Sequence, residues 1–156
     1  MESEAFARMI LDMTDTLYRI CCAQLSQKAD REDAVQETLR KAWEKRKSLR
    51  DERYVKTWVI RILLNECHTI QRRMKRTLPL DTVPAVPKLQ EDGEIKEALM
   101  QLPEKYRIPL VLYYLEGYSV KDTALMLHLP QGTVKTRLSR GRSMLKAILK
   151  EEVFEG

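Results

Sequence analysis

The sequence has no apolar run long enough to cross a membrane, and it does not begin like a secretory leader. Glu2 and Glu4 stand where a signal peptide would carry basic residues. A membrane-spanning helix needs about 20 consecutive apolar residues, whereas charged residues make up 33% of this chain. We therefore expect no leader, no membrane insertion and a cytoplasmic location.

Cysteine and histidine are scarce, with three cysteines and two histidines in 156 residues. An odd number of cysteines does not make a disulfide framework. Cys67 precedes His68, so a catalytic or zinc-binding pair is one alternative. Adjacent helix positions point about 100° apart, however, and no second Cys/His cluster completes a metal site. Core or surface thiols are the favoured interpretation, and no metal or other cofactor is expected.

Loops rich in glycine and carboxylate pairs of the enzymatic kind are also missing, because only five glycines are scattered along the chain. We therefore expect the protein to catalyse no reaction itself. Positive charge, in contrast, is in excess, with a net charge of +5 and a pI of about 9.1. Residues 1–76 carry +5 and residues 99–156 carry +3, whereas residues 77–98 carry −3. Two basic segments flanking an acidic connector indicate a nucleic-acid partner.

Residues 118–146 have the pattern of two helices joined by a tight turn, YSVKDTALMLHLPQGTVKTRLSRGRSMLK. Ser119 is a good N-cap, three residues before Asp122. Pro130 suits the start of the second helix. Apolar or small residues then recur at helical spacing and form one buried stripe: Val134, Leu138, Gly141, Leu145 and Ile148. The pattern predicts a helix-turn-helix.

The face opposite this stripe carries hydroxyl and arginine side chains bordered by further cations. Arginine can pair bidentately with guanine, serine and threonine can donate or accept, and flanking cations can hold phosphates. A solvated basic face on an ordinary helix pair is the alternative interpretation. The candidate DNA-reading residues are Lys135, Thr136, Arg137, Ser139, Arg140 and Arg142.

The N-terminal half is predicted to contain three helices. Residues 3–25 form one amphipathic pattern, and Asp30 is expected to cap a second helix that reaches about residue 46. Asp33, Gln36 and Glu37 lie off the apolar stripe of that second helix and form a small patch rich in acid and amide groups. Acids near a helix N-terminus also favour the helix dipole, which explains Asp33 better than the other two.

A long helix is predicted over residues 55–76, with a polar, basic stripe opposite its apolar face. Cations for the backbone, an aromatic for a base and an amide for hydrogen bonds suit single-stranded DNA. A lone aromatic at helical spacing is more often a packing residue, and this is the favoured interpretation for Trp58. His68 is expected at the surface. The candidate residues on this helix are Lys56, Trp58, Arg61, Asn65, Arg72 and Arg76.

Residues 77–90, TLPLDTVPAVPKLQ, contain three prolines and no periodicity, which predicts an extended linker. Helices resume from residue 91. Pro109 is expected either to kink its helix or to mark the point where a helix restarts, Gly117 to follow a helix end, and Gly141 to permit a close helix approach. The fold class is therefore all-α, with two small helical domains at residues 1–76 and 91–156.

Several segments together resemble the extracytoplasmic-function (ECF) sigma factors of bacterial RNA polymerase. These segments are DREDAVQETLRKAW, VKTWVIRILLNE and LPEKYRIPLVLYYLEGYSVKDTALMLHLPQGTVKTRLSRGRSMLK. The resemblance covers nearly the whole chain in family order, and it departs from the family at Pro109 and Gly141. It implies a sigma-2 domain at residues 1–76 and a sigma-4 domain at residues 91–156.

The resemblance also implies roles for the candidate residues. Asp33, Gln36 and Glu37 match the positions that dock on the β′ clamp helices of the polymerase. Residues 49–55 match the loop that captures a flipped base of the −10 element, and Asn65 borders that pocket. The basic face of residues 135–142 matches the −35 reader. The family further implies contact with the β flap, promoter DNA, a stress or envelope-response regulon and an anti-sigma factor.

Two other classes remain open on the sequence alone. A stand-alone regulator would bind DNA through the same helix-turn-helix and would use its N-terminal half to dimerise or to bind a ligand. That half shows no apolar dimer seam. An enzyme using Cys67 and His68 would require turnover that depends on a thiol, which alkylation would test.

Overall fold

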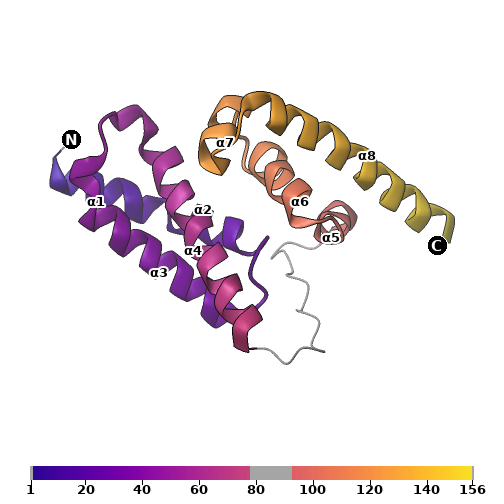
Figure 1. Ribbon diagram of the computed structural model, residues 1–156, viewed down its shortest axis with the longest axis horizontal. Coiled ribbons are helices and arrows are strands. Elements are labelled where there is room, and N and C mark those ends of the chain that lie inside the picture. Colours follow the sequence, from indigo (N-terminus) through magenta and orange to yellow (C-terminus); the bar gives the residue numbers. More distant parts are fainter. Residues whose placement is uncertain (1, 78–92, 156) are drawn as a thin grey trace.

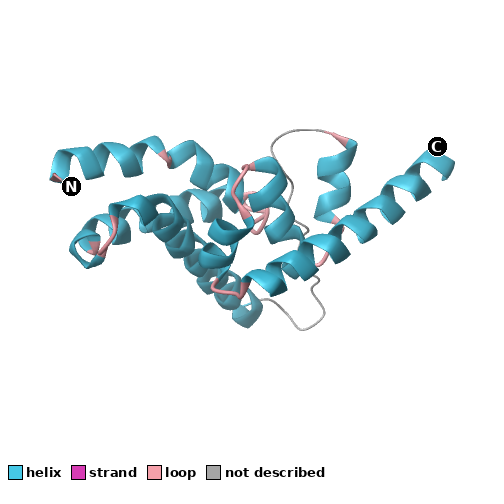
Figure 2. Cartoon of the chain, turned by 90° about the horizontal axis from the view of Figure 1, so that it is seen from above, coloured by secondary structure: helices cyan, strands magenta, loops and turns pink. Residues whose placement is uncertain are grey.

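The computed structural model describes residues 2–77 and 93–155, and every regular element in these residues is a helix (Figures 1 and 2). The N-terminal half contains α1 (Ser3–Asp12), α2 (Thr14–Cys21), α3 (Lys28–Glu44), the 3-10 turns η1 (Arg46–Ser48) and η2 (Glu52–Tyr54), and α4 (Val55–Thr77). The C-terminal half contains α5 (Glu94–Met100), α6 (Glu104–Leu110), the π-helical turn η3 (Val111–Leu115), α7 (Val120–Leu127) and α8 (Gln131–Glu155). The all-α fold class is confirmed.

The prediction of one helix over residues 3–25 is wrong, because the helix is interrupted at Met13 and α2 ends at Cys21. The hydroxyl of Thr14 donates to the carbonyl of Leu11 at 2.7 Å, and the Met13 amide bonds to Ile10, three residues back. Such local bonds compete with the regular helix ladder. The apolar periodicity continues across the break, so Phe6 and Leu17 are both buried.

The second predicted helix begins earlier than expected. Helix α3 starts at Lys28, after an N-cap Gln27 that makes no side-chain cap bond, so Asp30 is not the cap. Asp30 lies in the first turn, where its charge favours the helix dipole. The helix ends at Glu44, before η1. Its predicted stripe faces the core, with Ala34, Val35, Thr38 and Ala42 buried.

The helix is irregular after Pro109, and the chain turns at Gly117. Helix α6 contains Pro109 near its end, and the following residues wind as the π-helical η3, in which the Glu116 amide bonds to the Val111 carbonyl, five residues back. Gly117 then has a φ of +78°, a left-handed conformation that glycine adopts without a Cβ clash. This irregular connection leads the chain into α7.

The two halves pack against each other through apolar and polar contacts. Four side chains of the C-terminal half, Ile108, Val111, Leu112 and Met126, belong to the same core cluster as the buried residues of α1 to α4. The carboxylate of Glu104 accepts from the amides of Gln24 at 3.1 Å and Gln71 at 2.8 Å. Arg19 pairs with Glu116 at 3.0 Å. Separate folding of residues 1–76 and 91–156 stays a prediction, and the linker at 77–90 lies almost wholly outside the described residues.

A second, smaller core lies within the C-terminal half and positions α8. It is formed by Leu99, Leu102, Leu110, Ala124, Val134 and Leu138. Gly141 lies against α6 so closely that a Cβ built on it would stand 2.8 Å from Leu110 Cδ1. The predicted close helix approach at Gly141 is therefore confirmed. The C-terminal end of α8 extends beyond the other helices of this half (Figure 1).

A matched pair of glycine substitutions tests this packing. Gly141→Ala should lower the free energy of unfolding by about 1–2 kcal/mol, because overpacking a core outweighs the gain of about 1 kcal/mol in helix propensity. Gly132→Ala has no atom within 4 Å of its new Cβ, so it should be neutral or stabilising by up to about 1 kcal/mol. Urea unfolding of both variants measures the difference. Equal or greater stability of Gly141→Ala than of Gly132→Ala would contradict the packing.

Candidate nucleic-acid interface

The helix-turn-helix is built by a cap at its first helix and a tight left-handed turn. The hydroxyl of Ser119 accepts from the amide of Asp122 at 3.0 Å, as predicted. His128 ends α7 in the left-handed region, with a φ of 56°. The Leu129 amide then bonds back to Ala124 at 3.0 Å, which closes the helix end. The sequence analysis did not foresee this conformation of His128, because glycine or asparagine occupies such a position more often, although histidine also favours it among the other residues.

The predicted DNA-reading face of α8 lies on the surface. Val134, Leu138 and Gly141 are buried on one side of the helix. On the other side Arg137 is half-buried, and the remaining candidates are exposed: Lys135, Thr136, Ser139, Arg140 and Arg142. The arrangement offers several hydrogen-bond donors and exposed cations along a helix that can enter a major groove.

Two contacts on this face were not visible in the sequence. The hydroxyl of Thr136 donates to the carbonyl of Gly132 at 3.0 Å, so its lone pairs remain available to accept from a base. The guanidinium of Arg142 donates to the hydroxyl of Tyr114 at 2.6 Å. Tyr114 lies 28 residues earlier in the chain, and only the fold brings it to the flank of α8.

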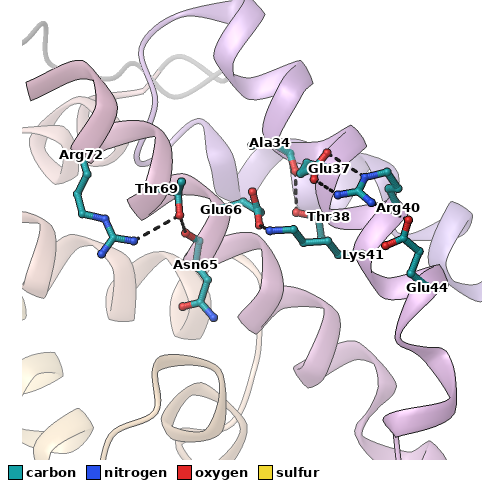
Figure 3. Close-up of polar contacts among 10 residues, drawn as sticks. All are labelled: Ala34, Glu37, Thr38, Arg40, Lys41, Glu44, Asn65, Glu66, Thr69 and Arg72. Atoms are coloured by element: carbon teal, nitrogen blue, oxygen red, sulfur yellow. Dashed lines mark hydrogen bonds and ion pairs between the residues drawn. The ribbon is translucent and has the colours of Figure 1, made fainter. Parts of the chain in front are cut away.

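The polar stripe of α4 is also at the surface. Lys56, Arg61, Asn65, Arg72 and Arg76 are exposed. Trp58 is half-buried, and its ring lies 6.3 Å from that of Phe6 in a tilted edge contact, which supports the packing interpretation. The backbone carbonyl of Asn65 accepts from Thr69 at 3.0 Å, while its amide side chain points away from α3 (Figure 3).

The C-terminal half lies beside part of this stripe. Arg61 contacts Nδ1 of His128 at 3.1 Å, which links the stripe to the turn of the helix-turn-helix. A groove of about 450 Å³ lies further along α4, and its lining includes Asn65, Arg72 and Glu104. The turn before α8 and the start of α6 therefore border the α4 stripe.

The loop ahead of α4 is more ordered than the sequence indicated. Residues 52–54 form the 3-10 turn η2, which is capped when the carboxylate of Asp51 accepts from the Arg53 amide at 3.0 Å. The Arg53 guanidinium also pairs with Asp51 at 2.8 Å. Hydrogen bonds from Arg53 hold the pKa of Asp51 below its ordinary value. The expected charged loop thus has a defined shape at the entrance to α4.

The acidic patch on α3 lies beside a cation, Arg40, that the sequence analysis did not include. Asp33 and Gln36 are exposed and Glu37 is half-buried. Arg40 donates to Glu37 and also pairs with Glu44 at 2.6 Å (Figure 3). The hydrogen bond from Arg40 holds the pKa of Glu37 below its ordinary value. Arg40 lies three residues after Glu37 and four before Glu44, and this helical spacing could have predicted both ion pairs.

Glu66 is a buried carboxylate on α4, and the structure gives it a partner. Its carboxylate forms an ion pair with Lys41 across the α3–α4 contact (Figure 3). Such a partner makes burial of a carboxylate tolerable. Glu66 is therefore part of the packing between the two helices.

Cys67 and His68 do not form one site, because Cys67 is fully buried and His68 is exposed. The Sγ of Cys67 lies 3.9 Å from that of Cys21. The hydrogen bond with Cys21 raises the pKa of Cys67, and burial of the thiol raises it further. A raised pKa reduces the thiolate population that nucleophilic or metal-binding chemistry would need. The core-thiol interpretation is the better one.

The described helices include none that is both long and apolar enough to span a bilayer. Comparison with protein families finds two adjacent matches in chain order. The family described as Sigma-70 region 2 matches residues 9–77, and the family described as Sigma-70, region 4 matches residues 92–145.

Individual relatives agree with these matches. The ECF RNA polymerase sigma factor SigM of Mycobacterium tuberculosis is 34% identical over 139 residues, covering 85% of this chain and 71% of the relative. The ECF RNA polymerase sigma factor SigW of Bacillus subtilis is 30% identical over 176 residues, covering 96% and 91%. The solved complex of the sigma factor RpoE with the anti-sigma factor NepR, from Bartonella quintana, matches with a TM-score of 0.78 and 29% identity, covering 94% of this chain and 98% of that one.

Proposed function

Because this chain belongs to the ECF sigma factors of bacterial RNA polymerase, we propose a division of its surface among promoter DNA, the polymerase and an inhibitor. As a sigma factor it confers promoter specificity on the polymerase and starts transcription. Residues 1–76 act as the sigma-2 domain and residues 91–156 as the sigma-4 domain. The residues that carry each role are assigned from their exposure and chemistry.

The −35 element is read by the outer face of α8. Arg140 is the candidate for a bidentate base contact, because it projects opposite the buried stripe. Thr136 and Ser139 lie beside it on the exposed surface and supply shorter hydrogen-bonding groups. Lys135, Arg137 and Arg142 flank them and contact phosphates.

The −10 element is held by the loop at residues 49–55 and the polar stripe of α4. Lys56, Arg61, Arg72 and Arg76 supply charge along the stripe, and Asn65 supplies an amide beside the flipped base. Trp58 is half-buried against the core, so its contribution is to fix the start of α4. Arg61 must exchange its contact with His128 for DNA, which requires the two halves to separate locally.

The polymerase is bound through the acidic patch of α3, formed by the exposed Asp33 and Gln36 and the half-buried Glu37. Carboxylates repel phosphate, so this patch suits a basic protein helix, and the β′ clamp helices are its expected partner. The sigma-4 domain additionally contacts the β flap. The protein acts in the cytoplasm and catalyses no reaction itself.

Regulation by an anti-sigma factor is part of this proposal. It is supported by the match to RpoE, which was solved in complex with the anti-sigma factor NepR. The genes controlled are expected to form a stress or envelope-response regulon. The alternative of a stand-alone regulator is not favoured, because the match to region 2 covers the N-terminal half that such a regulator would use for dimerisation or ligand binding.

The observation that carries the proposal is the pair of family matches in chain order, each falling on a half that carries an exposed basic surface. It predicts that the free protein binds promoter duplex weakly and that core polymerase confers tight binding. Each half offers few phosphate contacts, and linking them helps only when both sites are held at the right spacing. Fluorescence anisotropy with and without core polymerase measures this difference. A tight, specific complex at physiological salt without polymerase would favour a stand-alone regulator.

A further inference from the structure

A groove of about 650 Å³ separates α6 from the first turns of α8. Its lining includes three cationic side chains, one phenol and two hydroxyls, contributed by Lys105, Tyr106, Thr133, Thr136, Arg137 and Arg140. Only the last three belong to the surface assigned to the −35 element. Lys105 and Tyr106 come from α6, whose sequence gave no DNA-binding signal.

The two helices that line this groove approach each other closely at Gly141. The backbone of α8 lies so near to α6 here that a Cβ atom built on Gly141 would be 3.5 Å from the Cβ of Tyr106. Tyr106 therefore lines the groove together with Arg140, the residue before Gly141 on α8. The ammonium of Lys105 lies 5.0 Å from the centre of the same ring.

The groove carries positive charge with no acid to balance it. No carboxylate is among the described residues that line it. Glu104 is the nearest acid along α6, and its carboxylate is turned towards Gln24 and Gln71 on the N-terminal half. Desolvation would raise the pKa of the Tyr106 hydroxyl, yet the nearby cations Arg140 and Lys105 lower it below its ordinary value. The groove is thus suited to an anion.

The position of the groove identifies the source of that anion. Thr136 and Arg140 line the groove and also belong to the exposed face proposed to read the −35 element. A DNA strand that contacts this face would run past the mouth of the groove. Its phosphates carry one negative charge each and can accept from Lys105, Arg137 and Tyr106 together.

We propose that the α6–α8 groove holds one backbone phosphate of the −35 duplex, with Lys105 and Tyr106 as DNA-contacting residues. This inference rests on the proposed function of α8. The phosphate contact fixes the register of α8 in the major groove but reads no base. Arg140 lines the groove with Tyr106 and is also the candidate base-reading residue, so the phosphate contact and the base contact lie side by side.

The experiment uses full-length protein in complex with core polymerase and a promoter duplex selected by that complex from a random library. Lys105→Gln should weaken the complex roughly tenfold, the size of a lost charged hydrogen bond, and should reduce the salt slope by about one. Base preferences at the −35 positions should not change. Lys150→Gln is the matched control, because it removes the same charge from an exposed position ten residues beyond Arg140 on α8.

Neutral methylphosphonate linkages, placed one at a time in the −35 strands, locate the contact. One position should weaken binding by wild-type protein and have little further effect on Lys105→Gln, because both changes remove the same interaction. Additive losses at every position would overturn the proposal. Inorganic pyrophosphate serves as the probe for a free anion. Lys105-dependent binding of pyrophosphate that does not displace the duplex would also overturn it.

The outcomes separate this inference from the function on which it rests. If the wild-type complex recognises a −35 element but Lys105→Gln behaves like Lys150→Gln, the groove is not a DNA contact and the function stands. If the wild-type complex recognises no −35 element, the proposed function fails and this inference fails with it.

Discussion

Glu37→Lys is expected to abolish tight binding to core polymerase while the protein stays folded. Like charges facing each other across an interface cost several kcal/mol, and the new lysine would also stand beside Arg40. The position is at the surface, so the free energy of unfolding should change by only about 0.5–1 kcal/mol. Asp33→Lys, at a more exposed position of the same patch, should weaken binding in the same direction.

Glu44→Lys is the matched control for this experiment. Glu44 lies on the same helix and pairs with the same Arg40, at 2.6 Å, but it lies outside the proposed docking patch. Both variants therefore lose an ion pair to Arg40 and gain the same charge. The affinity of full-length protein for core polymerase is the measurement, and circular dichroism verifies the fold. Equal binding by Glu37→Lys and Glu44→Lys would mean that the patch serves only the helix itself.

Arg140→Ala is expected to relax base preference at one position of the −35 element. Loss of a bidentate contact to a base should remove about 1–3 kcal/mol of discrimination against other bases at that position. Arg140 is exposed opposite the buried stripe of α8, which is why the effect should be specific.

Arg142→Ala, on the flank of the same helix, supplies the comparison. Arg142 is held by the hydroxyl of Tyr114 at 2.6 Å and is proposed to contact a phosphate. Its loss should weaken all sequences alike and reduce the salt slope by about one. The measurement is the affinity of each holoenzyme for duplexes carrying every base at each −35 position. Uniform losses in both variants would show that the reading face has been assigned to the wrong side of α8.

Structural features that depend only on residues close together in the sequence were predictable. The cap at Ser119, the left-handed Gly117, the buried stripe of α8 and the interruption after Pro109 each depend on a few neighbouring residues. The exposed stripe of α4 followed from periodicity in the same way. The break at Met13 could not be predicted from periodicity, because the apolar pattern continues through it while local hydrogen bonds interrupt the helix.

Contacts between distant segments were not predictable from one sequence. The pairs Arg19–Glu116, Gln71–Glu104 and Arg61–His128 join positions between 33 and 97 residues apart. No regular sequence spacing predicts these pairs, because each pair depends on how the two halves pack against each other. For the same reason the groove beside Tyr106 became visible only when α6 and α8 were placed side by side.

Transcription by purified core polymerase tests the central claim most directly. A template carrying a promoter selected by the complex is transcribed by core polymerase with and without the full-length protein, and run-off products are mapped to their start sites. As a sigma factor, the protein should produce one defined start, positioned by the −35 and −10 elements, and core polymerase alone should not. A protein that binds the same DNA yet leaves core polymerase without a defined start would contradict the account.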